Sequence, residues 1–245
     1  MARLTTIPLD KTRDEPETDE PLLTWWQSVY DHVFVALHPF VERGLVGSSV
    51  ADHEKAGAQM RWGELARDIG GSAFTDFALA LVMASYGVKP EQREQMDLPV
   101  PPEGLVDRVH DAMGVRGEDY PWDDSISPAL ELGLAEAFER LGARSLVAWT
   151  EFREASSVVS CRTLAAHGTE WRQRLPQPLH VLQDGQARML VTASFDDLWS
   201  LIALTDAARD GVQPETLFEG FWAGPETRTD WLNHPGSYQP PADWP

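Results

Sequence analysis

Apolar residues recur along much of the chain at the spacing of helices that bury one face. Between 74 and 86 they return every three or four positions, and Ser72 stands where a side chain caps a helix start. The segment 127–142 repeats this spacing, with a proline at its first helical position and a glycine at its end. Shorter helices are predicted over 60–70 and 103–114.

Other segments have the composition of buried strands. The run 33–38 is apolar with β-branched residues and predicts a strand, and we also predict a strand over 143–152. Two further apolar runs within 178–193 flank Asp184 and Gly185. This dipeptide tolerates the positive φ angles of a two-residue type I′ turn, so we predict a β-hairpin here.

The C-terminal third is less regular. We predict a helix over 194–211, because acids occupy its first turn and apolar residues follow at helical spacing. Two Pro-Glu-Thr triplets, at 214–216 and 225–227, predict two short helices joined by Phe221 and Trp222. The segment 155–168 fits a helix and a strand pair equally well.

The order of elements shows no regular strand–helix alternation, which predicts an α+β fold. We expect a single domain over residues 21–245, with a mostly antiparallel or mixed sheet, helices on one side of it, and a C-terminal hairpin followed by helices. Residues 1–20 are acidic and contain few large apolar groups, which predicts a flexible tail. The segment 89–105 contains four prolines and is predicted to be a surface connection.

The net charge of −19 is the strongest global signal. It repels phosphate backbones and anionic lipid and attracts basic proteins, so no nucleic-acid or membrane partner is expected and a basic protein partner is favoured. A generally acidic proteome would explain the same charge. The sequence does not predict an oligomeric state.

The sequence gives no indication of export or membrane insertion. Its longest apolar run, at 77–87, is shorter than the roughly 18 residues that cross a bilayer. The N-terminus lacks the apolar stretch of a secretory signal, so a cytoplasmic location is expected.

Familiar catalytic motifs are absent. The sequence has no GxSxG, GxGxxG, GxxxxGK[ST] or HExxH pattern. Cys161 is the only cysteine, which excludes an internal disulfide and a cysteine-based zinc site. We therefore expect no metal and no cofactor.

Four residues could still form an acid–base site if the fold brought them together. His38, at a strand end before a proline, and His234 are candidate acids or bases, and Arg228 could orient an anionic substrate beside Asp230. His32 is six residues before His38, so one strand would place both on the same face. Such a group would act in a small-molecule hydrolase or transferase.

Five residues are candidates for binding. Asp119, Asp123 and Asp124 belong to an acidic loop at 118–124, which lacks the spacing of a calcium loop and would contact a basic partner. Trp222 and Trp231 are candidates for an aromatic wall or a sugar-binding platform.

Three functions follow from these residues. The leading hypothesis is a non-catalytic acidic domain that docks a basic protein, as an inhibitor or immunity-type protein does. The alternatives are the small-molecule enzyme and a carbohydrate-binding module. The enzyme needs its four candidate residues in one pocket, and the sugar-binding module needs two exposed tryptophans side by side.

Overall fold

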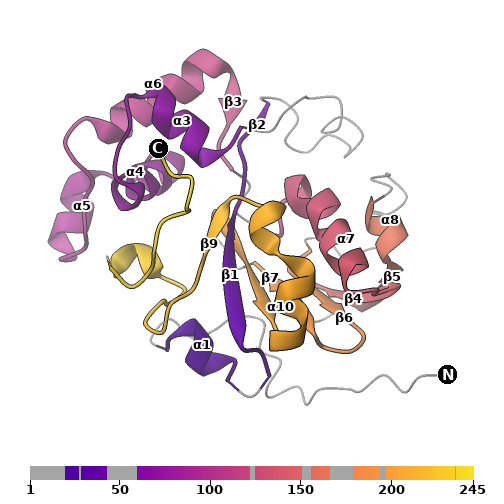
Figure 1. Cartoon of the computed structure of the whole chain (residues 1–245). Helices are drawn as coiled ribbons and strands as arrows, with labels where there is room; N and C mark the ends of the chain where they lie inside the picture. Colours follow the sequence, from indigo (N-terminus) through magenta and orange to yellow (C-terminus); the bar gives the residue numbers. More distant parts are fainter. Residues whose placement is uncertain are drawn as a thin grey trace.

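The computed structural model describes residues 20–27, 29–42, 60–121, 125–150, 156–165, 179–193, 197–234 and 236–245. Within these ranges, an antiparallel seven-stranded sheet has the order β5-β4-β6-β7-β8-β1-β9 (Figure 1). Its strands are β1 His32–Leu37, β4 Ser145–Trp149, β5 Ser156–Ser160, β6 Val181–Asp184, β7 Met189–Thr192, β8 Trp199–Leu204 and β9 Gly220–Trp222. The short strands β2 (Val41–Glu42) and β3 (Glu118–Asp119) form a separate pair. The α+β class is confirmed.

The helices form two groups on either side of the sheet (Figure 1). The first group comprises α1 Leu22–Trp25, α3 Trp62–Asp68, α4 Phe74–Tyr86, α5 Pro90–Gln95, α6 Leu105–Arg116 and the 3-10 turn η3 Trp231–Asn233. The second comprises the turn η1 Pro128–Leu130, α7 Glu131–Arg140, α8 Cys161–Ala165 and α10 Asp206–Val212, with the turn η2 Pro214–Thr216 following α10.

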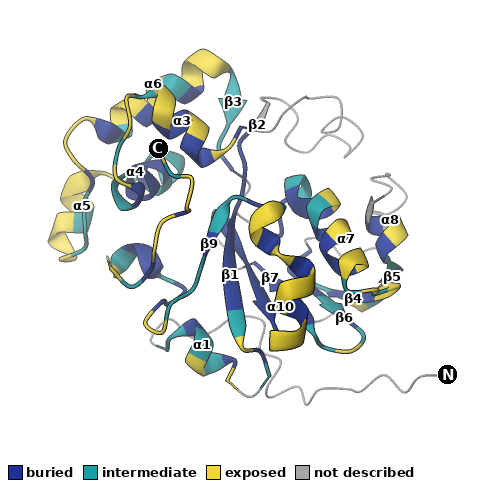
Figure 2. Ribbon diagram, in the orientation of Figure 1, coloured by how far each residue is buried: buried dark blue, intermediate teal, exposed yellow. Residues whose placement is uncertain are grey.

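The sheet separates two hydrophobic cores. Because side chains alternate along a strand, Val33 and Val35 of β1 join the core built with α1, α3, α4 and α6. Phe34 and Ala36 join the core built with α7, α8 and α10. Buried residues therefore line both sides of the central strands (Figure 2). We expected helices on one side of the sheet only, whereas in the structure helices pack against both faces.

Most of the predicted helices are present. Helices α3, α4 and α7 lie within the ranges expected for them, and Gly87 ends α4 in the left-handed conformation that favours glycine. Helix α6 was expected within 103–114 and continues to Arg116. The residue before α4 is Ala73, and no side chain caps this helix, so the predicted cap at Ser72 is wrong. The predicted connection at 89–105 contains α5, which begins at Pro90.

The predicted helix over 194–211 is wrong in its first part. Residues Trp199–Leu204 form β8, and the helix α10 begins only at Asp206. Every residue of β8 is buried, because β7 and β1 flank it and a core lies on each face. A continuous apolar run suits such a strand, and the helical spacing within the run is incidental. Residues 194–196 lie outside the described ranges.

The hairpin of β6 and β7 is confirmed, but its turn is not the predicted two-residue type I′. Residues 185–188 form the turn, and positive φ occurs at Ala187 rather than at Gly185. The buried carboxylate of Asp184 accepts hydrogen bonds from the backbone N–H groups of Arg188 (2.6 Å) and Met189 (3.0 Å) and from Arg188 Nε (2.9 Å). This side chain therefore organises the wider turn.

The two short helices predicted near the C-terminus are also corrected. The first Pro-Glu-Thr triplet forms only the 3-10 turn η2, and Phe221 and Trp222 belong to β9, which pairs with β1. The second triplet forms a turn, with η3 following at Trp231. Backbone pairing at the free edge of β1 therefore determines the conformation of the aromatic joint.

Two other expectations fall at the limits of the described residues. The ambiguous segment 155–168 forms β5 followed directly by α8 as far as Ala165. The remainder of that segment and residues 1–19 of the predicted tail lie outside the described ranges. Within those ranges, no helix is long and apolar enough to cross a membrane.

Replacement of Gly220 by alanine should strongly destabilise the protein. A Cβ atom at this position would lie 2.0 Å from the carbonyl oxygen of Val35, so β9 cannot pair with β1 without a backbone shift. We expect the free energy of unfolding to fall by about 3 kcal/mol. The matched control is Gly211→Ala in α10, where an added Cβ contacts no other atom. Alanine has the higher helix propensity, so this variant should gain about 0.5–1 kcal/mol in its free energy of unfolding. Urea unfolding of both variants measures the difference, and equal stabilities would contradict the close approach.

Replacement of Asp184 by alanine should lower the free energy of unfolding by about 3 kcal/mol, because the half-buried Arg188 guanidinium and the backbone N–H groups of Gln186, Arg188 and Met189 lose their acceptor. Gln186→Ala on the same turn is the control, since loss of this exposed side chain should change the free energy of unfolding by less than about 0.5 kcal/mol. Thermal unfolding of both variants checks the prediction. A midpoint for Asp184→Ala close to that of the control would show that the turn forms without the carboxylate.

Candidate functional site

His38 lies directly after β1 and is completely buried. Its backbone N–H continues the ladder by donating to Leu198 O at 2.9 Å, and its Nε2 lies 2.8 Å from Ser200 Oγ. Ser200 lies in β8, which places the imidazole on the sheet face of Phe34 and Ala36. The His38 ring is therefore bonded within the core that contains α7 and α10.

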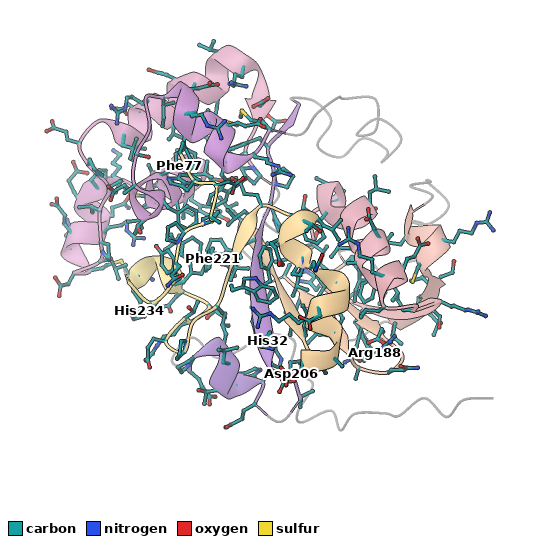
Figure 3. All side chains as sticks on the ribbon, in the orientation of Figure 1. His32, Phe77, Arg188, Asp206, Phe221 and His234 are labelled. Atoms are coloured by element: carbon teal, nitrogen blue, oxygen red, sulfur yellow. The ribbon has the colours of Figure 1, made fainter. Side chains whose placement is uncertain are left out.

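His32 shares this face with His38 but has a different partner. Its Nε2 lies 2.7 Å from Asp206 Oδ1, and the backbone N–H of Asp206 donates to Asp31 Oδ2 at 2.7 Å. Figure 3 shows His32 and Asp206 together near the lower end of β1. These contacts attach the start of α10 to β1, so the two histidines share no ligand.

Asp230 and His234 are brought together, as the enzyme hypothesis requires. His234 Nε2 lies 3.2 Å from Asp230 Oδ2, and the His234 side chain is 44% exposed. Arg228 is half-buried on the same segment, between β9 and η3. The Oγ atom of the nearby half-buried Ser237 is itself buried and has no hydrogen-bond partner among the described residues. The nucleophile–base contact of a hydrolytic triad is therefore not formed here.

The sheet keeps His38 apart from the other three candidates. Trp231 follows Asp230 directly and belongs to the core on the opposite face, where its ring centroid lies 5.0 Å from that of Trp199. Figure 3 shows His234 beside the C-terminal segment, away from His32 and Asp206. Asp230 and His234 thus lie together on one side of the sheet, and His38 lies on the opposite face.

The two candidate tryptophans do not form a platform. Trp231 is completely buried and stacks on Phe74 with an interplanar angle of 3°. Trp222 is half-buried, its ring lies against Phe34, and the Arg209 guanidinium lies 4.8 Å from the ring centroid. One ring fills a core and the other is covered by a cation, so neither offers a free face beside the other.

The acidic loop is described only in part. Asp119 lies in β3 opposite Val41, and Asp123 and Asp124 lie outside the described residues. Burial raises the pKa of the neighbouring Glu118 carboxyl above its ordinary value. Among the described residues, no group of three or more His, Cys, Asp or Glu side chains could hold a metal ion.

Helices α5 and α6 carry a concentration of charge that the sequence analysis overlooked. The outward sides of both helices are exposed (Figure 2). The exposed acids on and between them, which we call the α5–α6 acidic surface, are Glu91, Glu94, Asp97, Glu103, Asp107 and Asp111. Lys89, Arg108 and Arg116 are the exposed bases of this region, and Arg116 pairs with Asp68 of α3. The spacing of acids every three to six residues was the signal in the sequence.

The α5–α6 acidic surface also contains apolar groups. Met96, next to α5, is 68% exposed, and Val115 in α6 is 89% exposed. Helix α5 buries none of its residues. It is attached through Arg93, which donates to Asn233 Oδ1 and to Pro99 O, both at 2.7 Å, and whose pKa is lowered by desolvation. Because α5 has no buried residue, its side chains are accessible to another molecule.

The half-buried Glu219 joins two parts of the fold. Its carboxylate accepts hydrogen bonds from the backbone N–H groups of Trp62 (2.6 Å) and Gly63 (2.8 Å), at the start of α3. Burial raises the pKa of the Glu219 carboxyl above its ordinary value, and the two N–H donors oppose this effect. The contact joins the segment before β9 to α3.

The described part of the chain is thus an α+β protein with two acid–imidazole pairs, His32–Asp206 and Asp230–His234, and a separate acidic helical surface. The chain belongs to the family described as "Protein of unknown function (DUF2711)", whose model matches residues 18–233. Comparisons with curated proteins and with solved structures give no match.

Ionisation of Glu219 should lower stability as the pH rises. Because the folded-state pKa lies above the ordinary value of 4.5, the folded protein binds this proton more tightly than the unfolded chain. The stability that the protonated Glu219 carboxyl contributes is fully present below pH 4.5, and it is lost as the pH rises through the folded-state pKa. Urea unfolding of wild type and Glu219→Gln between pH 4 and 7 should show that wild type loses stability relative to the variant. A constant difference would contradict the raised pKa.

Proposed function

We propose that this protein is a non-catalytic binding domain that docks a basic protein through the α5–α6 acidic surface. The observation that carries the proposal is the excess of exposed acids over exposed bases on these two helices, six against three. One of the three bases, Arg116, is engaged by Asp68. The net negative charge of this surface is part of the −19 of the whole chain.

The apolar side chains on these helices support the same function. Protein interfaces combine apolar contacts with a charged rim, and methionine is enriched in them. Met96 and Val115 are among the large apolar side chains that the described surface exposes. Met96 is flexible and polarisable, which suits a contact that adapts to its partner.

The charges act mainly on encounter and orientation. A field of one sign raises the association rate with an oppositely charged protein, and salt screens it over about 8 Å at physiological ionic strength. We therefore expect association that is fast at low salt and falls as salt is added. Apolar contact through Met96 would contribute the part of the affinity that salt does not remove.

Removal of three charges from this surface should weaken partner binding. We expect Glu91→Gln/Glu94→Gln/Asp97→Asn to reduce affinity about tenfold, because each exposed ion pair contributes up to about 1 kcal/mol. The immobilised protein captures proteins from a lysate of its own source, and mass spectrometry identifies those eluted by salt. Titration with the purified partner then measures the affinity of each variant.

The matched control carries the same change of charge elsewhere. Asp210→Asn/Glu215→Gln/Glu226→Gln removes three exposed acids outside the surface and should bind as wild type does. Equal losses in both variants would show that only total charge matters. The proposal fails if no captured protein distinguishes the two variants.

A further inference from the structure

Helix α6 buries one side and exposes the other. Its buried residues, spaced four apart, are Leu105, Val109 and Met113. Successive residues of a helix are turned by about 100°, so positions 107, 111 and 114 lie roughly opposite these three, and all of them are exposed. Position 115 adjoins them and is exposed as well. The α6 outer face, as we call it, consists of Asp107, Asp111, Gly114 and Val115.

Gly114 has no conformational role in α6. It lies inside the helix without a positive φ, and Gly117 provides the left-handed end of the helix. A Cβ atom at Gly114 would have no neighbour within 4 Å outside its own helix. Glycine within a helix lowers stability relative to alanine. Gly114 therefore weakens α6 without any packing requirement in the described fold, as is expected where another molecule packs against the helix.

A glycine on a helix surface allows a second helix to come close. The axes of packed helices lie about 8–10 Å apart, and the side chains at the contact decide the distance. Gly114 presents only its backbone, and the adjoining Val115 is 89% exposed, more than any other large apolar side chain of the described surface. A bare stretch of backbone beside an exposed apolar side chain is suited to helix packing.

The carboxylates of the α6 outer face favour a helix of positive charge. Asp107, Asp111 and Val115 are spaced four residues apart, so they form one row along the helix. A second helix that runs along this row would place residues of its own four apart opposite the three side chains. Lysine or arginine opposite the two acids and an apolar residue opposite Val115 would match the row in charge and in polarity.

We propose, building on the function proposed above, that the basic partner binds through an amphipathic helix that packs along α6, with its closest approach at Gly114. An apolar side chain of that helix contacts Val115, and basic residues four and eight positions away face Asp111 and Asp107. Docking of an amphipathic helix through anchors at such spacing is a recurrent mode of recognition. The partner is thus recognised by the pattern of its helix as well as by its net charge.

Two synthetic peptides of identical composition test the inference. Each has about 18 residues of lysine, leucine and alanine, a length that supports a helix. The patterned peptide places leucine and lysine on one helical face at four-residue spacing, and the scrambled peptide distributes them around the helix. Titration calorimetry at low salt should show that the patterned peptide binds wild type at least about tenfold more tightly than the scrambled peptide.

Replacement of Gly114 by glutamine should reduce the affinity for the patterned peptide about tenfold, because the new side chain occupies the point of closest approach without a change in charge. Gly211→Gln makes the same change at an exposed glycine of α10, which also has open surroundings, and should bind as wild type does. Val115→Thr should lose about fourfold, since it removes one methyl group from the contact. Val158→Thr, at an exposed valine of β5, is its control.

A measurement on wild type alone keeps the test independent of any variant. On addition of the patterned peptide, the largest changes in backbone amide NMR shifts should lie within 107–116. Changes confined to other elements would overturn the inference, and so would equal binding of the patterned peptide to Gly114→Gln and Gly211→Gln.

The remaining outcomes separate this inference from the proposed function. If both peptides bind wild type equally and Glu91→Gln/Glu94→Gln/Asp97→Asn weakens both, the surface recognises charge alone, so the function stands and the helix is overturned. If neither peptide binds while a protein captured from lysate distinguishes the charge variants, the helix is again overturned and the function stands. If no captured protein distinguishes those variants, the proposed function fails by its own test.

Discussion

The pairing of β1 with β8 is the contact on which the rest of the structure depends. Both strands are buried along almost their whole length, so their alternating side chains supply two separate cores. Burial of apolar surface stabilises a fold by roughly 25 cal/mol per Å², and these two strands bury apolar side chains on both of their faces. Helices from the N-terminal half pack on one face and helices from the second half on the other, so the pair joins distant parts of the chain.

This arrangement explains the roles of the buried and partly buried polar groups. A polar group removed from water must find a hydrogen-bond partner within the protein. His38 meets Ser200 across the β1–β8 pair, Asp184 accepts the N–H groups of its turn, and Glu219 meets the start of α3. These side chains connect elements of the fold. The histidine most attractive as a catalyst in the sequence is thus engaged in a core contact.

The sequence predicts what local patterns determine and fails where tertiary pairing decides. Helices α4 and α7 and the β6–β7 hairpin are recognisable because apolar spacing and terminal glycines are local features. Strand β8 is misread because its apolar run contains a helical spacing by chance, and only its burial between two strands makes it extended. The conformation of β9 depends on the free edge of β1 and on the absence of a side chain at Gly220. No local signal carries that information.

The candidate site was predictable to a similar extent. The contact between Asp230 and His234 follows from their spacing of four residues, and the structure contains it. The separation of His38 from this pair depends on which face of the sheet each residue occupies, which the sequence does not reveal. The acids of the α5–α6 acidic surface were visible in the sequence, but their common exposure depends on how the two helices pack.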